Sequence, residues 1–209
     1  MTQVLEGIVK TKAMPHLLLH GPPGTGKTSA ILALARELYG DEHFRDRVLE
    51  LNGSDDRGIG KIREKVKTYA ESKLSRLNPS SPNFKIIILD EADNMTPDAQ
   101  NALRRMMEDY SQVTRFCLIC NYVTKIISPL NSRCVKFRFK EISFDSQIKQ
   151  IQSIAHEEKI NISEHAMEGI IILCDGDMRQ CLNLIQLCRS SFKGSQISFD
   201  QIKMITDVS

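Results

Sequence analysis

The sequence lacks the features that mark membrane, secreted and repeat proteins. No apolar run approaches the roughly 20 residues of a membrane helix, and no signal-peptide pattern is present. Internal repeats and low-complexity tracts are missing too. Hydrophobic residues make up 41% of the chain and charged residues 26%. This balance is typical of a soluble globular protein with enough apolar material for a core, and no membrane partner is expected.

The sequence also has little net charge. Its 28 Lys and Arg residues nearly cancel 26 Asp and Glu residues, which leaves +2. A balance this even does not by itself indicate nucleic-acid binding. Any nucleic-acid surface must therefore be local.

The six cysteines lack the spacing of a zinc site. Cys117 and Cys120 have C-x-x-C spacing, but they lie in a predicted buried strand, where alternate side chains face opposite ways. No Cys or His pair with zinc spacing accompanies them. Cys174, Cys181 and Cys188 recur every seven residues, as small apolar residues do on helix faces. We interpret all six as reduced packing residues of an intracellular protein.

One motif is highly specific. Residues 21–28 fit the phosphate-binding pattern G-x-x-x-x-G-K-[ST], between a predicted strand at 16–19 and a predicted helix at 28–39. The motif consists of Gly21, Pro22, Pro23, Gly24, Thr25, Gly26, Lys27 and Thr28. Its glycines let backbone N–H groups turn toward phosphate oxygens, and the helix N-terminus adds its positive dipole end. Lys27 would lie against the β- and γ-phosphates of ATP, and the Thr28 hydroxyl would hold Mg²⁺.

A second motif places two carboxylates at a strand end. The apolar segment 84–89 reads as a buried parallel strand, and Asp90 and Glu91 follow it, where open α/β sheets bind ligands. Asp90 is suited to hold Mg²⁺, and Glu91 is suited to polarise the attacking water. The alternative is a solvated acidic loop. Residues 90–93 also spell a helicase signature, but such helicases need two nucleotide domains, and no second phosphate loop is present.

The order of patterns predicts two domains. Strands at 16–19, 48–51, 84–89, 115–120 and 135–139 alternate with helices, which indicates an α/β fold with a mainly parallel sheet over residues 1–140. Residues 141–209 read as all-helical. Helices are expected there at 145–159, 163–174, 177–190 and 198–206. Ser163, Asp177 and Ser198 are the expected N-caps.

Together these motifs resemble AAA+ ATPases and, more narrowly, the small subunits of the replication factor C clamp loader. The matching segments are residues 19–29, 49–59, 87–93, 101–105 and 132–134. The last, Ser132-Arg133-Cys134, is the most specific, because such a triplet marks clamp loaders among AAA+ proteins. The resemblance covers nearly the whole chain. It implies a P-loop AAA+ domain with a five-stranded, mainly parallel sheet, followed by a small all-helical lid domain.

The resemblance also implies roles for three polar residues. Asn121 looks like the sensor 1 residue, whose amide could hold the attacking water or the γ-phosphate. Arg133 looks like an arginine finger that acts on ATP bound to a neighbouring subunit. Arg179 resembles sensor 2, which reaches the γ-phosphate from the lid. The plain alternatives are a strand-end turn former for Asn121, a surface salt bridge for Arg133 and an ordinary first-turn charge for Arg179.

The DNA-binding signal depends mainly on the resemblance. Arg57, Arg63 and Lys125 match positions that contact DNA phosphates in replication factor C, and such contacts position the protein without reading sequence. By charge alone, the mixed acidic and basic residues around Arg63 favour a solvated helix face.

The implied function is that of an ATP-hydrolysing subunit in a sliding-clamp loader of DNA replication and repair. Its expected partners are other replication factor C subunits in a hetero-pentameric ring, the sliding clamp and primer–template DNA, and its expected location is the nucleus. ATP binding would close the ring, and hydrolysis would release the clamp. The isolated chain should hydrolyse ATP slowly, because its finger must come from a neighbour. Two alternatives stay open: a non-hydrolysing assembly subunit and another AAA+ DNA-remodelling ATPase.

The sequence departs from the family at both ends, as a natural short form, a split gene product or a fragment would. Family members carry about 25–30 residues before the position of Met1, and a C-terminal helical collar of roughly 100 residues. The collar is the main ring-assembly surface of the family.

Overall fold

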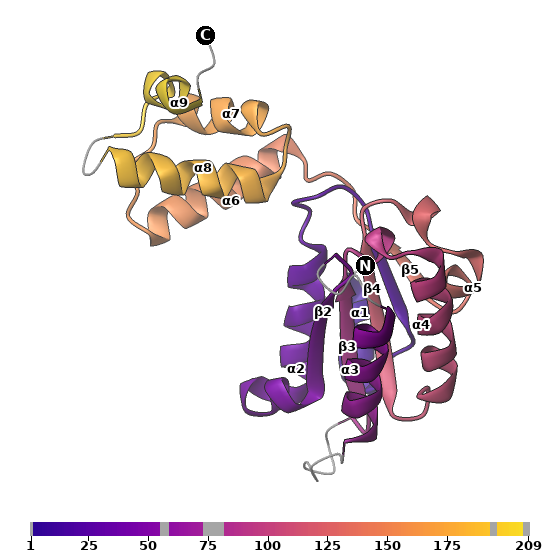
Figure 1. Ribbon diagram of the computed structural model, residues 1–209. Helices are drawn as coiled ribbons and strands as arrows, with labels where there is room; N and C mark the ends of the chain where they lie inside the picture. The colour runs from indigo at the N-terminus through magenta and orange to yellow at the C-terminus, as the bar shows by residue number, and fades with distance from the viewer. Residues whose placement is uncertain (1, 55–58, 73–81, 193–195, 207–209) are drawn as a thin grey trace. The chain divides into compact units, whose positions relative to one another are not determined.

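A computed structural model describes residues 2–54, 59–72, 82–192 and 196–206 of the chain (Figure 1). The chain divides into two compact units. The first contains residues 1–21 and 26–139, and the second contains residues 22–25 and 140–209. The sequence placed the boundary one residue later, after Lys140, and assigned the whole phosphate loop to the first domain.

The first unit is built on a five-stranded sheet. The strands are β1 (Leu17–His20), β2 (Val48–Asn52), β3 (Lys85–Asp90), β4 (Thr114–Cys120) and β5 (Val135–Arg138). Their order is β2-β3-β4-β1-β5, and every neighbouring pair is parallel. The predicted five-stranded parallel sheet is confirmed. Because all strands run the same way, their carboxyl ends meet at one edge of the sheet, where such folds bind ligands.

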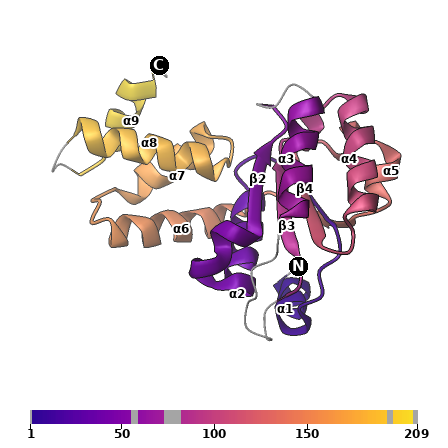
Figure 2. The same cartoon turned by 60° about the horizontal axis from the view of Figure 1, so that its bottom comes forward.

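Helices cover both faces of this sheet (Figure 2). Those of the first unit are α1 (Thr2–Thr11), α2 (Lys27–Arg47), α3 (Ile59–Glu71), α4 (Pro97–Asp109) and α5 (Ser128–Asn131), with 3₁₀ turns η1 (Ala92–Asn94) and η2 (Val123–Lys125). One core cluster joins α1 and α2 to strand residues such as Leu17 and Ile88. The other joins α3, α4 and α5 to residues such as Leu18 and Ile87. Alternate side chains of the strands thus pack into two separate cores, one on each face of the sheet.

Two helix boundaries follow from local sequence. Thr96 accepts a hydrogen bond from the Ala99 N–H at 3.3 Å, and Pro97 opens α4, as expected for an N-cap followed by proline. The predicted helix at 28–39 ends where Gly40 takes non-helical angles, φ 71° and ψ 162°. The chain then resumes helical geometry up to Arg47, which the sequence analysis did not anticipate.

All six cysteines are free and buried. Cys117 belongs to the cluster under α2, and Cys120 belongs to the cluster under α4. The two side chains of the C-x-x-C spacing therefore point to opposite faces of β4, as the strand interpretation requires.

The second unit is helical apart from residues 22–25 and its loops. Its helices are α6 (Phe144–Glu157), α7 (Glu164–Leu173), α8 (Met178–Ser191) and α9 (Phe199–Thr206). Ser163 and Asp177 accept hydrogen bonds from first-turn N–H groups, and Ser198 accepts one from the Gln201 N–H at 3.4 Å. This unit has its own apolar core around Ile170, Cys181 and Ile202. In the described part of the chain, no helix combines the length and the apolar character needed to cross a membrane.

Candidate nucleotide site

The loop between β1 and α2 needs its glycines. Gly21 has φ 145°, and a Cβ there would lie 2.1 Å from the carbonyl oxygen of Phe139. Gly26 has φ 85° and caps the start of α2. Both values lie in the region that side chains rarely adopt. The loop therefore turns sharply into α2, whose first N–H groups have no partner within the helix and form an anion-binding end.

Lys27 is almost entirely buried at this turn, with 7% of its surface exposed. Its ammonium donates hydrogen bonds to the Gly21 carbonyl at 2.8 Å and to Asn121 Oδ1 at 3.0 Å. A buried ammonium needs such acceptors to offset its desolvation. These bonds tie the phosphate loop to the carboxyl end of β4, two segments 94 residues apart in the chain.

Thr28 and Asp90 meet directly. The Thr28 hydroxyl donates to Asp90 Oδ2 at 2.7 Å, and the other carboxylate oxygen, Oδ1, accepts from the Glu91 N–H at 2.8 Å. The two residues lie at the N-terminus of α2 and the end of β3. The structure thus joins the two motifs that the sequence analysis connected to Mg²⁺.

Glu91 has an unusual backbone conformation. Its φ is 52°, in the left-handed region, which is costly for a residue with a side chain and which clusters at functional sites. Its carboxylate accepts a hydrogen bond from the Asn94 side chain at 3.0 Å. The turn places the Glu91 side chain just beyond Asp90, at the carboxyl edge of the sheet.

Asp93 fixes the end of β4. This carboxylate is 9% exposed, and its Oδ2 accepts hydrogen bonds from the backbone N–H groups of Asn121, at 3.2 Å, and Tyr122, at 3.0 Å. Because the backbone of Asn121 is held from one side and its side chain bonds Lys27 on the other, the Asn121 amide has a defined position.

The carboxyl edge carries charges of both signs. Burial lowers the pKa of His20, at the end of β1, and the nearby cations Arg138, Lys136 and Lys27 lower it further. Burial, with a smaller effect of Asp93, raises the pKa of Cys120 to about 12, so this thiol stays neutral. Cations thus lie around the end of β1 and carboxylates at the end of β3, an arrangement that suits an anion bound together with a cation.

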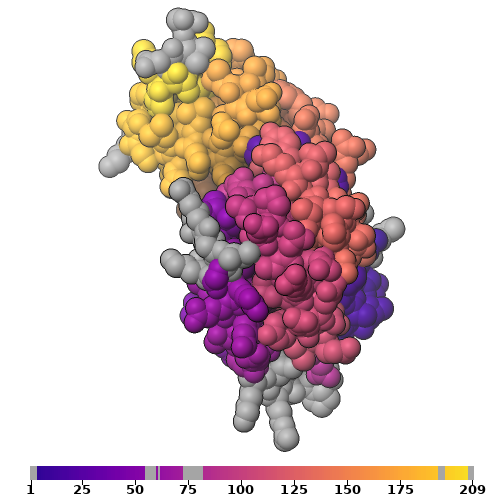
Figure 3. Space-filling view, turned by 45° about the vertical axis from the view of Figure 1, so that its right-hand side comes forward, coloured from indigo at the N-terminus to yellow at the C-terminus, as the bar shows by residue number. Residues whose placement is uncertain are grey.

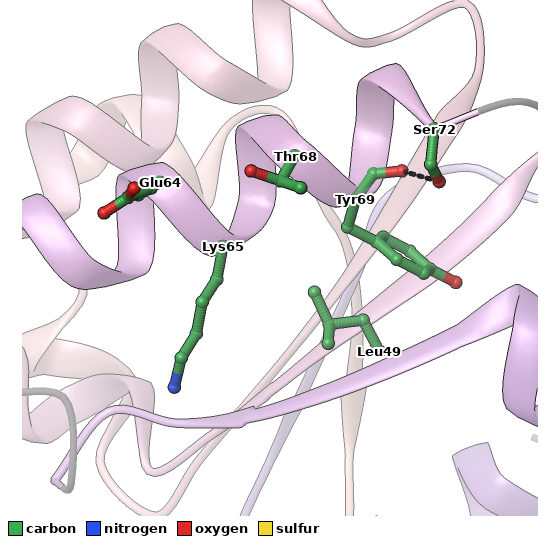
Figure 4. A pocket seen from close by; sticks show the side chains of 6 residues that line it. All are labelled: Leu49, Glu64, Lys65, Thr68, Tyr69 and Ser72. Carbon is green, nitrogen blue, oxygen red and sulfur yellow. Dashed lines mark hydrogen bonds between the residues drawn. The ribbon is translucent and has the colours of Figure 1, made fainter.

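A cavity of about 370 Å³ opens beside the Thr28–Asp90 pair. Glu50, Asn52 and Lys65 contribute polar groups to its wall. A second, more apolar pocket of about 470 Å³ lies between α3 and the edge strand β2 (Figure 4). Its lining residues are Leu49, Glu64, Lys65, Thr68, Tyr69 and Ser72. Lys65 lines both pockets. None of the six residues belongs to the phosphate loop or to the β3 and β4 ends, so the second pocket borders the candidate nucleotide site without containing its key residues.

The oxygen atoms of Thr28 and Asp90 are suited to hold Mg²⁺ together with a nucleotide. Among the described residues, no group of three or more His, Cys, Asp or Glu side chains could hold a metal ion. A cation here would depend on the Thr28 hydroxyl and Asp90, with further oxygens from a ligand and water. Mg²⁺ is held in this way, by one or two protein oxygens plus phosphates and water.

Arg133 lies at the opposite edge of the sheet. It comes two residues before β5, and Val135 is level with Leu17, the first residue of β1, whereas the phosphate loop follows the last residue of β1. Its guanidinium forms an ion pair with Glu108 on α4. The structure therefore separates Arg133 from its own phosphate loop and includes the surface salt bridge that was the plain alternative.

The remaining predicted residues lie elsewhere. Arg179 is in the first turn of α8 in the second unit, where its N–H donates to the Asp177 carboxylate at 2.9 Å. Arg63 is exposed on α3. Lys125 is exposed in η2, with its ammonium 5.1 Å from the centre of the Tyr122 ring. Arg57 lies outside the described residues.

Three supporting residues were not predicted from the sequence. Asp93 was recognised only as part of a motif, and nothing in the sequence marked it as the buried acceptor for two N–H groups. Gln100 joins η2 to α4, because it donates to the Lys125 carbonyl at 3.0 Å and accepts from the Ile127 N–H at 2.8 Å. Glu108 was not singled out at all. Its position one helical turn after an arginine was the only feature of the sequence that could have indicated its role.

Comparisons with known proteins agree with this geometry. The family model described as "ATPase family associated with various cellular activities (AAA)" matches residues 17–142, and the "RFC1-like, AAA+ ATPase lid domain" matches residues 145–204. Replication factor C subunit 2 of Saccharomyces cerevisiae is 51% identical over 92% of this chain and 56% of its own length. Replication factor C subunit 4 of Homo sapiens is 50% identical over 98% of this chain and 56% of its own length. The chain thus spans a little over half the length of these relatives.

Solved structures share the fold at low sequence identity. The Thermotoga maritima RuvB Holliday junction branch migration motor superposes with a TM-score of 0.71 at 20% identity, over 99% of this chain and 66% of that chain. The phosphate loop, the strand-end carboxylates, the parallel sheet and the family match lead to one conclusion. This chain belongs to the AAA family of ATPases and carries the nucleotide-binding fold of that family.

Proposed function

We propose that the chain is the ATP-hydrolysing part of a subunit in a sliding-clamp loader. The observation that carries the proposal is the hydrogen-bonded set at the carboxyl edge: Lys27 to Asn121, and Thr28 to Asp90. The relatives named replication factor C subunits support the clamp-loader class. Its proposed partners are other subunits of that kind, the clamp and primer–template DNA, and its proposed location is the nucleus.

Each residue of the site has a task in this proposal. Lys27 and the N–H groups that open α2 bind the phosphates of ATP. Thr28 and Asp90 would hold Mg²⁺, which would supply positive charge to the phosphoryl oxygens. Glu91 accepts a proton from the attacking water, and the Asn121 amide orients that water or the γ-phosphate. Arg179 is the proposed sensor from the lid.

Hydrolysis also needs a group that this edge does not supply. The proposed finger, Arg133, lies at the other edge of the same sheet, so it would act on ATP bound to an adjacent subunit. A guanidinium fork suits the charge that grows on transferring phosphoryl oxygens. The chain alone should therefore bind ATP and hydrolyse it slowly.

Two variants test the proposal in the assembled ring. Lys27→Ala should lose ATP binding, by about tenfold or more for each charged hydrogen bond removed. Glu91→Gln should still bind ATP but lower turnover by roughly 10²–10⁴-fold, because the base is lost while Thr28 and Asp90 remain. Filter binding and phosphate release measure the two effects.

The outcomes separate the alternatives. If Glu91→Gln hydrolyses ATP at the wild-type rate, this residue is not the base. If the unaltered chain binds ATP but never contributes turnover in any ring, it is a non-hydrolysing assembly subunit. If capture on immobilised sliding clamp is absent with and without ATP while turnover is normal, another AAA+ DNA-remodelling activity is favoured.

A further inference from the structure

Two arginines from different segments share one carboxylate oxygen on the surface of the first unit. Glu108 Oε1, in the last turn of α4, accepts from Arg104 Nη1 at 3.2 Å and also from Arg133 Nη2. The side chains of Arg104, Glu108 and Arg133 are 29%, 42% and 35% exposed. Helix α4 and the segment after it, in magenta to salmon, make up a large part of the first unit's surface in Figure 3.

Arg133 is held at two points rather than one. Besides its bond to Glu108, its Nη1 donates to the Pro129 carbonyl in α5 at 2.8 Å. The two bonds leave different nitrogens of the guanidinium and end on different helices. Two acceptors in fixed places define the plane of a guanidinium, whereas a single ion pair would let it rotate.

Arg104 in turn fixes Glu108. The two lie four residues apart on α4, so they face each other on the helix surface. Arg104 therefore holds the carboxylate in the position from which its Oε1 can reach Arg133. The described bonds use two of the five N–H donors of Arg133, and the other donors can serve an acceptor outside the chain.

We propose that Glu108 is a positioning residue for Arg133, which it presents to the nucleotide of the neighbouring subunit. This inference rests on the proposed trans action of Arg133. In a blocking role, Glu108 would keep Arg133 away from phosphate. The weakness of an exposed ion pair disfavours that role. Exposed ion pairs hold weakly, whereas an arginine finger gains roughly 10³–10⁵-fold in rate from its phosphoryl contacts. The pair can orient the guanidinium but cannot compete with a nucleotide for it.

The test uses the full-length protein in its assembled ring, with ATP turnover measured at the adjacent site. Glu108→Gln removes the charge and keeps an oxygen acceptor. We expect kcat at that site to fall roughly tenfold, since misplacing a reacting group by about 1 Å can cost up to about 10²-fold. The KM for ATP should stay within about twofold, because Glu108 makes no ground-state contact with nucleotide. Arg104→Ala should act in the same direction with a smaller effect.

A double-mutant cycle separates positioning from a general structural effect. In an Arg133→Ala background, Glu108→Gln should cause no further loss, because its effect passes through Arg133. Glu158→Gln is the matched control: Glu158 is also exposed and pairs with Arg189 at 2.8 Å in the second unit, so its loss should leave turnover unchanged.

The contrary results are distinct. Normal or raised turnover for Glu108→Gln, with Arg133→Ala strongly impaired, overturns the positioning role and leaves the finger intact. A further loss from Glu108→Gln in the Arg133→Ala background overturns it as well. Normal turnover for Arg133→Ala removes both the trans finger and the inference built on it.

Discussion

The two edges of the central sheet hold their key cations in opposite ways. At the carboxyl edge, Lys27 is 7% exposed and bonds two acceptors of its own unit. At the amino edge, the Arg133 side chain is 35% exposed in a surface ion pair. A buried ammonium must be positioned by the fold that surrounds it. An exposed guanidinium held by two of its five N–H donors keeps the others for an acceptor on another chain. The chain thus holds Lys27 by groups of its own unit, whereas the proposed action of Arg133 would need a neighbour.

The largest expected effect tests whether the two edges complement each other between chains. In a hetero-pentamer that holds one copy of this chain, Lys27→Ala should abolish turnover at the chain's own site and leave the adjacent subunit's site active, because the variant still offers Arg133 to that neighbour. Adding Arg133→Ala to the Lys27→Ala chain should then lower turnover at the adjacent site as well, by a large part of the roughly 10³–10⁵-fold typical of such arginines. Phosphate release from rings in which the adjacent subunit carries the one other intact phosphate loop measures it.

A matched double variant controls for a nonspecific loss. Lys27→Ala combined with Glu91→Gln should keep turnover at the adjacent site, because both changes lie in the chain's own site and Arg133 is intact. Loss of turnover there, or normal turnover with Lys27→Ala and Arg133→Ala together, contradicts action between chains.

The next effect probes how firmly the carboxyl edge is built. Asp93→Ala leaves the N–H groups of Asn121 and Tyr122 without their buried acceptor. Each unsatisfied group costs about 1–3 kcal/mol, so the loss of both bonds should lower the free energy of unfolding by about 2–6 kcal/mol. Turnover of the folded fraction should fall too, because Asn121 loses its anchor. Urea unfolding and phosphate release give the two readings. Asp93→Asn, which keeps an oxygen, should be milder; equal losses would mean that the charge alone matters.

The contrast between the edges also explains what the sequence could predict. The phosphate loop and the residues after 84–89 were predictable, because short apolar strands and glycine-dependent turns are local patterns. That Thr28 and Asp90 lie close together was expected from the shared Mg²⁺ role given to the two motifs, although their direct hydrogen bond was not. Glu108 was not predictable, because its contact with Arg133 joins residues 25 apart through the packing of α4 and α5. The role of Asp93 was not predictable for another reason. A carboxylate that accepts hydrogen bonds from buried N–H groups looks the same in sequence as a solvated one.

A smaller effect concerns how the free energy of unfolding depends on pH through His16, which lies at the edge where the strands begin. His16, just before β1, accepts a hydrogen bond from the Phe116 N–H through Nδ1 at 3.1 Å. Burial, aided by Arg115, lowers its pKa from 6.5 to about 4. The unfolded chain therefore binds more protons between these values, so stability is full above pH 6.5 and falls as the pH drops toward 4. Because the side chain is partly exposed, we expect a loss of about 1–2 kcal/mol.

Urea unfolding at several pH values checks this dependence. His16→Gln should reduce the slope between pH 6.5 and 4, because the titrating group is gone. His165→Gln is the control, since the His165 side chain is 77% exposed and should contribute little. An unchanged slope in His16→Gln would assign the acid sensitivity to other groups.

The smallest effect concerns the proposed DNA surface, which belongs to neither edge's chemistry. Arg63 on α3 and Lys125 in η2 are both exposed, and Arg57 was predicted to join them. If they contact phosphates, Arg63→Ala and Lys125→Ala should each weaken primer–template binding similarly for any sequence. Each should also make log K less steep in log[salt] by about one unit at most.

Fluorescence anisotropy on the assembled ring at several salt concentrations measures both the affinity and the slope. Arg189→Ala removes the same charge from the Glu158 pair and should leave the slope unchanged. Loss of a phosphate contact lowers the number of counterions released on binding and therefore the salt slope. An unchanged slope in the Arg63→Ala, Lys125→Ala double variant would thus mean that these residues do not contact DNA and that α3 presents a solvated face.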